Sequence, residues 1–186
     1  MDVYQLYDDC TGKYRDLFML FPFVYDFAQR FDGTPMKRPW SDARLEWDSE
    51  SRAPKPDFDL LLSVPTFNSR AMDALRDLLE GNGEILPTTC EGEQLFFYNV
   101  TRVIDAFDES NSKITRQPWG NEIWGIDKYT FFPEKLMGVV IFKIPRCDRV
   151  FVTDPFVERV KSSGLKGFWF LRRWSTDPTA IIDNVA

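Results

Sequence analysis

Carboxylates are the side chains that could do acid–base chemistry here, because the chain of 186 residues contains no histidine. Asp105 and Asp108, with Glu109, lie at the end of a strand-like segment, where such a pair could act as general acid and base. With the neighbouring serines they could also hold a divalent cation. The segment lacks the glycine and terminal glutamate of a calcium-binding loop. A turn, in which Asp108, Ser110 and Asn111 bond to the backbone, is the favoured interpretation.

Nucleophilic catalysis finds little support in the remaining residues. Without histidine, Ser-His-Asp and Cys-His systems and most zinc sites are excluded, and no phosphate-binding or nucleophile-elbow motif occurs. The three cysteines, Cys10, Cys90 and Cys147, are widely spaced. Acidic neighbours of the first two oppose thiolate formation, whereas Cys147 lies between Arg146 and Asp148. We interpret all three as reduced, unreactive thiols in a protein that needs no metal or cofactor and is not an enzyme.

Charge is distributed unevenly along the chain. Residues 1–111 carry 21 acidic and 11 basic side chains, whereas residues 112–186 carry 8 acidic and 12 basic ones. This asymmetry predicts an acidic face that attracts a cationic partner, although solubility alone also accounts for an acidic composition. Nucleic acid is not expected as a ligand, because phosphate binding needs a basic stripe.

An acidic row follows the clearest predicted helix, Thr66–Glu80, whose apolar residues recur at helical spacing and which Gly81 ends. The row supplies the acidic candidates for partner binding: Asp73, Asp77, Glu80, Glu84, Glu91 and Glu93. Such a row suits a basic active site or another basic protein surface. The alternative is a solvated helix face, in which Arg70 and Arg76 form weak local pairs.

Aromatic residues make up 16% of the chain and include six tryptophans, which are hard to bury completely. An exposed tryptophan is a good anchor for a protein partner. Four tryptophans lie in segments rich in proline, glycine and charge, and these are the aromatic candidates for partner binding: Trp40, Trp47, Trp119 and Trp124. Trp169 and Trp174 are left out, because the segment 167–171 has the composition of a buried strand.

The elements that must position these residues are mostly strands. Residues 1–56 are interrupted by glycine and proline, so we expect an irregular segment packed on the core, with short strands or loops at 3–7 and 18–25. Further strands are predicted at 60–64, 84–86, 95–100, 103–107, 123–132, 139–144, 150–153 and 167–171. Asp154 is the predicted N-cap of a second helix. The expected fold is α+β, a single domain with an antiparallel or mixed β-sheet flanked by a few short helices.

No membrane segment is expected. The opening residues MDVYQLYDDC lack the basic and apolar regions of a signal peptide. The apolar run at 17–24 is shorter than the ~20 residues that a membrane-spanning helix needs. We therefore expect a cytoplasmic protein.

From about residue 57 onward, the order of motifs resembles that of one family. PDF is followed by NSRAMDALRDLLEG, EILPTTCEGEQLFFYNVTRVIDAFDESNS, FFPEKLMGVVIFKIPRCDRVFVTD and SSGLKGFWF. This order resembles immunity protein family eleven of bacterial polymorphic toxin systems, formerly a domain of unknown function. The matching positions are Asn99, Val100, Asp105, Asp108, Ser110, Phe142, Pro145, Val152, Asp154, Gly164 and Gly167. The resemblance implies an immunity-type domain over residues 57–186.

This resemblance implies an antidote that binds a cognate protein toxin and blocks it. The acidic row and the exposed tryptophans would then steer and anchor the toxin. A nuclease is the first expectation for the toxin, because nucleases carry basic substrate clefts. The alternatives are a small enzyme or ligand-binding module that uses Asp105 and Asp108, and a module with a deep apolar pocket lined by Phe96, Tyr98 and Phe131.

Overall fold

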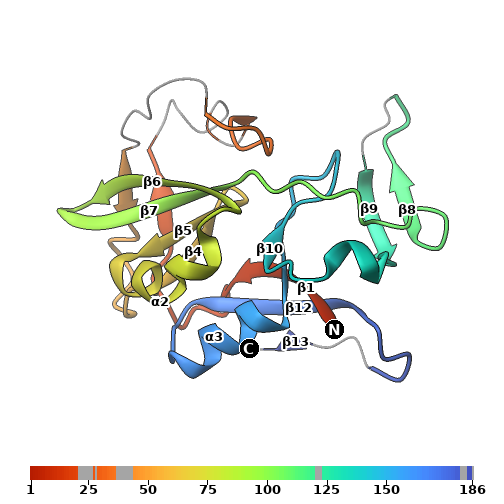
Figure 1. Ribbon diagram of the computed structural model, residues 1–186. Coiled ribbons are helices and arrows are strands. Elements are labelled where there is room, and N and C mark those ends of the chain that lie inside the picture. The colour runs from red at the N-terminus through yellow and green to blue at the C-terminus, as the bar shows by residue number, and fades with distance from the viewer. Residues whose placement is uncertain (21–26, 28, 37–43, 120–122, 181–183, 186) are drawn as a thin grey trace.

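The computed structural model describes residues 1–20, 27, 29–36, 44–119, 123–180 and 184–185, and most of its regular structure is β-sheet (Figure 1). The strands are β1 (Asp2–Asp8), β2 (Leu17–Met19), β3 (Leu45–Trp47), β4 (Phe58–Leu61), β5 (Val64–Asn68), β6 (Gly83–Cys90), β7 (Glu93–Val100), β8 (Lys113–Arg116), β9 (Ile123–Lys128), β10 (Ile141–Phe142), β11 (Phe151–Thr153), β12 (Phe168–Ser175) and β13 (Asn184–Val185). The helices are α2 (Ser69–Leu79), the 3-10 helix η1 (Pro133–Leu136) and α3 (Asp154–Ser162).

The described strands form three sheets. The first sheet is antiparallel and has the order β10-β11-β1-β12-β13. The second sheet has the order β2-β3-β6-β7-β5-β4 and is mixed, because β3 pairs with β6 in parallel. Strands β8 and β9 form a separate hairpin. The predicted α+β class agrees with helices beside sheets, but sheet predominates and is divided among these three units.

Strand β1 lies in the middle of the first sheet. It pairs with β11 through Val3–Gln5 and with β12 along its whole length. Its side chains alternate between two cores, since Tyr4 and Leu6 pack in one and Val3 in the other. The expectation of an irregular segment over residues 1–56 is therefore corrected. The strand predicted at 3–7 is a central strand, and β2 and β3 join the second sheet.

The buried apolar residues that the structure describes form three hydrophobic cores. The first core lies where the two large sheets and both α-helices meet, and it includes Tyr4, Phe67, Leu75, Tyr98, Val152, Phe156 and Phe170. The second core packs on the other face of the first sheet and includes Val3, Phe107, Ile126, Tyr129, Phe131, Phe142 and Phe151. The third core packs on the other face of the second sheet and includes Leu17, Phe31, Trp47, Leu95 and Phe97.

Helix α2 begins three residues later than its hydrophobic pattern predicts. Asn68 is the N-cap, and its side chain accepts a hydrogen bond of 2.9 Å from the backbone N–H of Ala71. The residues before it belong to β5. The strand predicted at 60–64 is wrong, because Leu62 and Ser63 have φ of 52° and 68° and turn the chain between β4 and β5.

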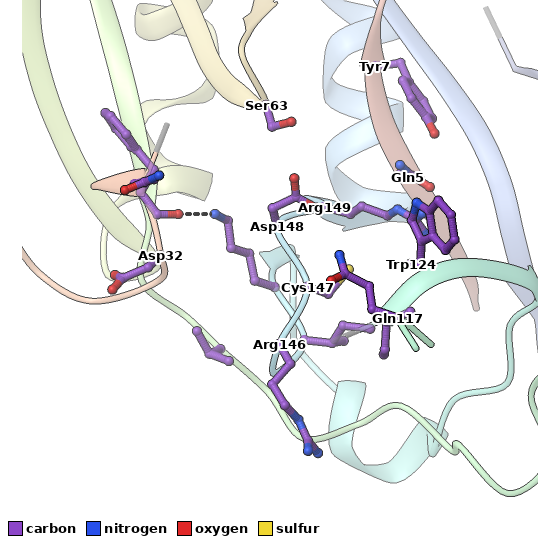
Figure 2. A pocket seen from close by; sticks show the side chains of 16 residues that line it. Gln5, Tyr7, Asp32, Ser63, Gln117, Trp124, Arg146, Cys147, Asp148 and Arg149 are labelled. Carbon is purple, nitrogen blue, oxygen red and sulfur yellow. Dashed lines mark hydrogen bonds between the residues drawn. The ribbon is translucent and has the colours of Figure 1, made fainter. Parts of the chain in front are cut away.

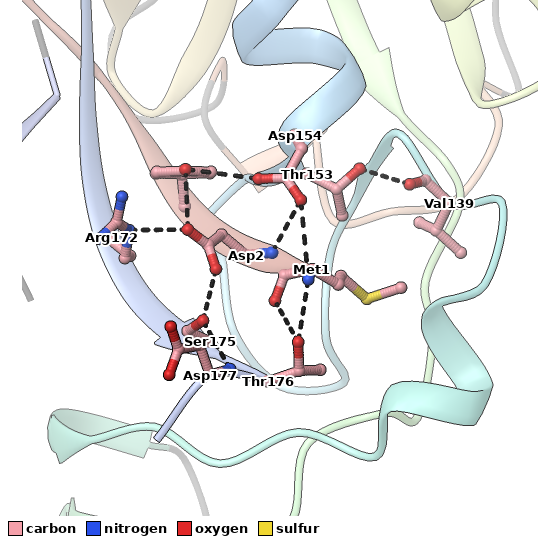
Figure 3. Close-up of polar contacts among 10 residues, drawn as sticks. Met1, Asp2, Val139, Thr153, Asp154, Arg172, Ser175, Thr176 and Asp177 are labelled. Carbon is pink, nitrogen blue, oxygen red and sulfur yellow. Dashed lines mark hydrogen bonds and ion pairs between the residues drawn. The ribbon is translucent and has the colours of Figure 1, made fainter. Parts of the chain in front are cut away.

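Asp154 also differs from its predicted role as a helix cap. Thr153 is the N-cap of α3, and Asp154 is the first helical residue. Its carboxylate accepts hydrogen bonds from the backbone N–H of Asp2 at 2.9 Å and from the Tyr4 hydroxyl at 3.4 Å (Figure 3). Asp154 thus fixes the start of α3 to the start of β1. Among the described helices, none is both long and apolar enough to cross a membrane.

A carboxyl group is buried where β4 meets β2. The Asp59 carboxylate accepts a hydrogen bond of 3.4 Å from the backbone N–H of Leu17. The pKa of Asp59 is raised to about 7, mainly by burial and also by the negative charges of Asp8 and Asp16, against the lowering effect of that hydrogen bond. Folding therefore favours the protonated form of this residue.

We predict that the free energy of unfolding decreases as pH rises from about 4 to about 7. Asp59 binds its proton more tightly in the folded than in the unfolded chain, so its stabilising contribution is complete below the unfolded pKa and is lost through this window. Asp59→Asn is expected to flatten the dependence by up to about 4 kcal/mol, measured by urea unfolding across this pH range. Parallel curves for the two proteins would contradict the assignment.

Candidate functional site

The four candidate tryptophans occupy different environments. Trp119 and Trp124 are 87% and 66% exposed; the first lies in the connection of the β8–β9 hairpin and the second on β9. Trp47 is only 4% exposed, so its prediction as a surface anchor is wrong. It lies on β3, where Leu45 and Trp47 point into the third core and the residue between them points outward. Trp40 lies outside the described residues.

The acidic candidates on α2 do share an exposed helix face. Asp73, Asp77 and Glu80 are all exposed. Asp77 forms two hydrogen bonds with the Arg159 guanidinium of α3, at 2.8 and 3.1 Å. No ion pair involves Asp73 or Glu80 among the residues that the structure describes. Two of the three carboxylates on this helix face, Asp73 and Glu80, therefore lack a described ion-pair partner.

The other acidic candidates do not continue this face. Glu84 is half-buried, and its carboxylate accepts hydrogen bonds of 2.9 Å from the Asn99 side chain and from the backbone N–H of Met36. Glu91 and Glu93 lie about 20 Å further along β6, at ~3.4 Å per residue, where the β6–β7 turn reverses the chain. Both pair there with Lys55, at 3.4 and 2.8 Å. The predicted single row is therefore divided into three separate groups.

The acidic helix and the exposed tryptophans do not form one surface. Figure 1 shows α2 and the β8–β9 hairpin on opposite sides of the molecule. The contacts of α2 are with α3, β5 and β7, whereas β8 and β9 pair with each other. The acidic candidates on α2 and the exposed tryptophans therefore lie on separate surfaces.

A polar pocket of about 780 Å³ opens beside Trp124 (Figure 2). Six segments distant in sequence form it: β1, residues 29–32, the β4–β5 turn, Val103 after β7, the hairpin, and the loop 143–149 after β10. Sequence reasoning missed this pocket. The available signal was the basic segment around Cys147, which was considered only for the reactivity of its thiol.

Lys143 forms the floor of this pocket. Its side chain is buried and donates a hydrogen bond to the backbone carbonyl of Phe31, which joins residues 29–36 to the loop after β10. Burial lowers the pKa of Lys143, although the nearby charge of Asp148 opposes that shift. Its ammonium is almost entirely buried and donates one hydrogen bond to the chain itself, so we assign Lys143 a structural role.

Two arginines lie at the β1 side of the pocket and are held by uncharged groups. Arg149 lines the pocket and donates a hydrogen bond of 2.6 Å to the Tyr129 hydroxyl, which in turn lies 3.3 Å from Gln5 Oε1. Arg173, behind the lining, donates to Gln5 Oε1 at 2.9 Å and to the Tyr7 hydroxyl at 3.1 Å. Its guanidinium also lies 5.2 Å from the centre of the Tyr129 ring. Gln5 is thus the acceptor shared by this network.

The carboxylates considered for catalysis serve the local turn instead. Asp108 is buried, and its oxygens accept hydrogen bonds from the Asn111 backbone at 3.1 Å and from the Asn111 side chain at 2.7 Å. The predicted turn bond to the backbone is confirmed for Asp108. The Asn111 side chain, in contrast, bonds the Asp108 carboxylate, and the hydroxyl that bonds the backbone belongs to Ser112 and not to the predicted Ser110. Asp105 is exposed. Within the described ranges, no three carboxylate or cysteine side chains gather as a metal site would require.

The remaining candidates are structural as well. Tyr98 is buried in the first core and Phe131 in the second, so these rings, with Phe96, do not line one pocket. All three cysteines are free. Burial raises the pKa of Cys90 to about 11 and also raises the pKa of Cys147, so both thiols are protonated at neutral pH.

Residues 85–173 match the model of the immunity protein family Imm11, which confirms the resemblance of the sequence to that family. No curated protein matches the chain. The matched region contains the β8–β9 hairpin with Trp119 and Trp124 and the loop that carries Arg149, whereas α2 precedes it. The match supports a toxin-neutralising immunity role, in which a protein binds its cognate toxin. Such a role is in general not enzymatic.

Proposed function

Since residues 85–173 carry the immunity-family region, we propose that this protein binds a cognate toxin with the β8–β9 hairpin and the pocket beside it, and neutralises the toxin by covering its active surface. The observation that carries the proposal is the exposure of Trp119 and Trp124, which lie on one hairpin inside that region. A tryptophan left largely in water is available to become buried in a partner.

The hairpin has further properties of a binding element. Among the described strands, β8 and β9 pair only with each other, so their outer edges offer unpaired backbone groups to a partner strand. Ile114, Ile123 and Ile126 pack against the second core and hold the base of the hairpin on the body of the protein. The hairpin is therefore both anchored and accessible.

We assign the acidic groups a role in attraction rather than contact. Asp73 and Glu80 on α2 have no ion-pair partner within the described residues, and Lys55 balances only one of the two charges of Glu91 and Glu93, so these groups contribute a negative field. Such a field speeds the approach of a basic protein without direct contact. This supports a nuclease as the toxin, because its substrate cleft is basic. The free cysteines favour a reducing compartment, and we place the complex in the cytoplasm.

Replacing both exposed tryptophans tests the proposed anchor. The double variant Trp119→Ala, Trp124→Ala is expected to bind the toxin encoded beside this gene at least about 100-fold more weakly, because each large ring loses its burial in the partner. Affinity is measured with the purified proteins, and growth of cells that express the toxin provides a second readout.

The variant Phe18→Ala is the matched control, since Phe18 is a 46% exposed ring on β2 in the second sheet. It is expected to leave toxin affinity unchanged. The double variant should also keep its thermal midpoint, because its rings are exposed in the free protein. Full affinity and full protection by the double variant would reject the hairpin as the anchor.

Charge reversal tests attraction separately. Asp73→Lys combined with Glu80→Lys is expected to slow association about tenfold at low salt and to leave the dissociation rate nearly unchanged, because these groups act only at a distance. The difference should disappear at high salt. Stopped-flow mixing with the toxin measures both rates. A change confined to dissociation would show that α2 is a contact surface instead.

A further inference from the structure

We propose that the pocket beside Trp124 receives an acidic side chain of the toxin, with Arg149 as its main hydrogen-bond donor. This inference rests on the proposed function and specifies the chemistry of the partner at one point. The sequence predicts that this protein contacts its partner through acidic residues. At the pocket, in contrast, the contacting group of this protein is cationic.

The guanidinium groups of Arg149 and Arg173 are bonded to uncharged groups. Arg149 and Arg173 form hydrogen bonds with Tyr129, Gln5 and Tyr7, which are all uncharged acceptors. In the described part of the chain, no carboxylate lies within ion-pair distance of either arginine. A guanidinium has five N–H donors, and the Tyr129 hydroxyl accepts a bond from only one nitrogen of Arg149. Arg149 therefore has donors left for a ligand in the pocket.

The other cations that line the pocket, Lys143 and Arg146, already contact oxygen atoms of the protein itself. Lys143 donates to the Phe31 carbonyl and is buried beneath the lining. Arg146 lies 3.8 Å from the Glu109 carboxylate and is exposed. Figure 2 shows Arg149 extending from its loop across the pocket, towards the side where Gln5 and Trp124 lie. The free cationic group thus lies beside the exposed ring.

The charges that line the pocket determine which ligand charge it can balance. The lining carries Lys143, Arg146 and Arg149 but also the carboxylates Asp32 and Asp148, so its positive excess is small. A single carboxylate balances this excess, and the planar guanidinium matches its two oxygens. A phosphate carries more negative charge and would meet the same two acidic neighbours. The geometry therefore favours an aspartate or glutamate side chain.

The pocket is continuous with the β8–β9 hairpin. Ile123 and Trp124 line the same pocket from β9, so an apolar rim borders the cationic group. A toxin segment with an acidic residue next to an apolar one would place its carboxylate at Arg149 and its apolar side chain against Trp124. Water would then be displaced from around the ion pair, which strengthens it.

The test compares three variants in binding to the toxin encoded beside this gene. Arg149→Gln is expected to weaken binding about 100-fold, because the toxin carboxylate is left buried without a partner. Arg149→Lys should recover only part of that loss, since it restores charge without the planar pair of donors. Arg52→Gln, which removes an exposed arginine outside the pocket lining, is the matched control and should change affinity less than threefold.

A double-mutant cycle identifies the partner group. Each exposed aspartate and glutamate of the toxin is replaced by its amide, alone and together with Arg149→Gln, and one residue is expected to show strong coupling to Arg149. Equal loss for every toxin variant, with no coupling to Arg149, would overturn the inference. It would leave the hairpin proposal standing, because that proposal depends on the tryptophan variants.

A second measurement uses the isolated protein and does not require the toxin. N-acetylglutamate is titrated against the chain, with the Arg149 side-chain N–H resonance as the readout, and inorganic phosphate is titrated in parallel. Saturable millimolar binding of the carboxylate, lost in Arg149→Gln, is expected. Tighter binding of phosphate would overturn the carboxylate assignment, and so would an Arg149 resonance that responds to neither anion.

Discussion

Strand β1 is hydrogen-bonded along both of its edges, to β11 on one side and to β12 on the other. These two neighbours lie 15 or more residues apart in the chain, with α3 between them, and without β1 the first sheet would be open in its middle. The same strand separates the first core from the second, because its alternate side chains enter both. It also places Gln5 against Tyr129 and Arg173. The family region at 85–173 contains β11 and most of β12 but not β1, so its sheet is completed by the N-terminal strand.

The proposed binding face depends on how the outer elements attach to this sheet. The β8–β9 hairpin packs its base on the second core and exposes two tryptophans, while the loop after β10 brings Arg149 next to it. Helix α2, in contrast, is committed to the first core, and one of its three acidic candidates is paired with Arg159 of α3. Anchoring and steering are therefore assigned to different sides of the molecule. Under the proposed function, the acidic side would attract a basic toxin, while the cationic pocket would bind one acidic group at the contact.

Local patterns were sufficient for some elements and not for others. The helical spacing of Met72, Leu75 and Leu79 located α2, and the aromatic run at 95–100 located β7. The segment 60–64 looked like a strand because it is apolar, but Leu62 and Ser63 form a turn that depends on pairing between β4 and β5. Pro87 seemed to end a strand, although β6 runs through it to Cys90 and meets β3 only at that last residue.

The candidate site was predictable only in part, because burial and grouping depend on contacts between distant segments. Trp119 and Trp124 lie in segments whose composition correctly indicated exposure, whereas Trp47 has similar flanking residues and is buried by strands that pair from elsewhere in the chain. The row of acidic residues was continuous in sequence, but the β6–β7 hairpin carries its two ends apart. The pocket could not be predicted at all, since six separate segments form it.

Hydrogen–deuterium exchange of the protein alone and in complex with the toxin is the most direct test of where this protein acts. Peptides from the β8–β9 hairpin and from the loop 143–149 are expected to exchange more slowly in the complex, and peptides from α2 are expected to exchange at the same rate. Protection confined to α2, with the hairpin and the loop unchanged, would contradict the account.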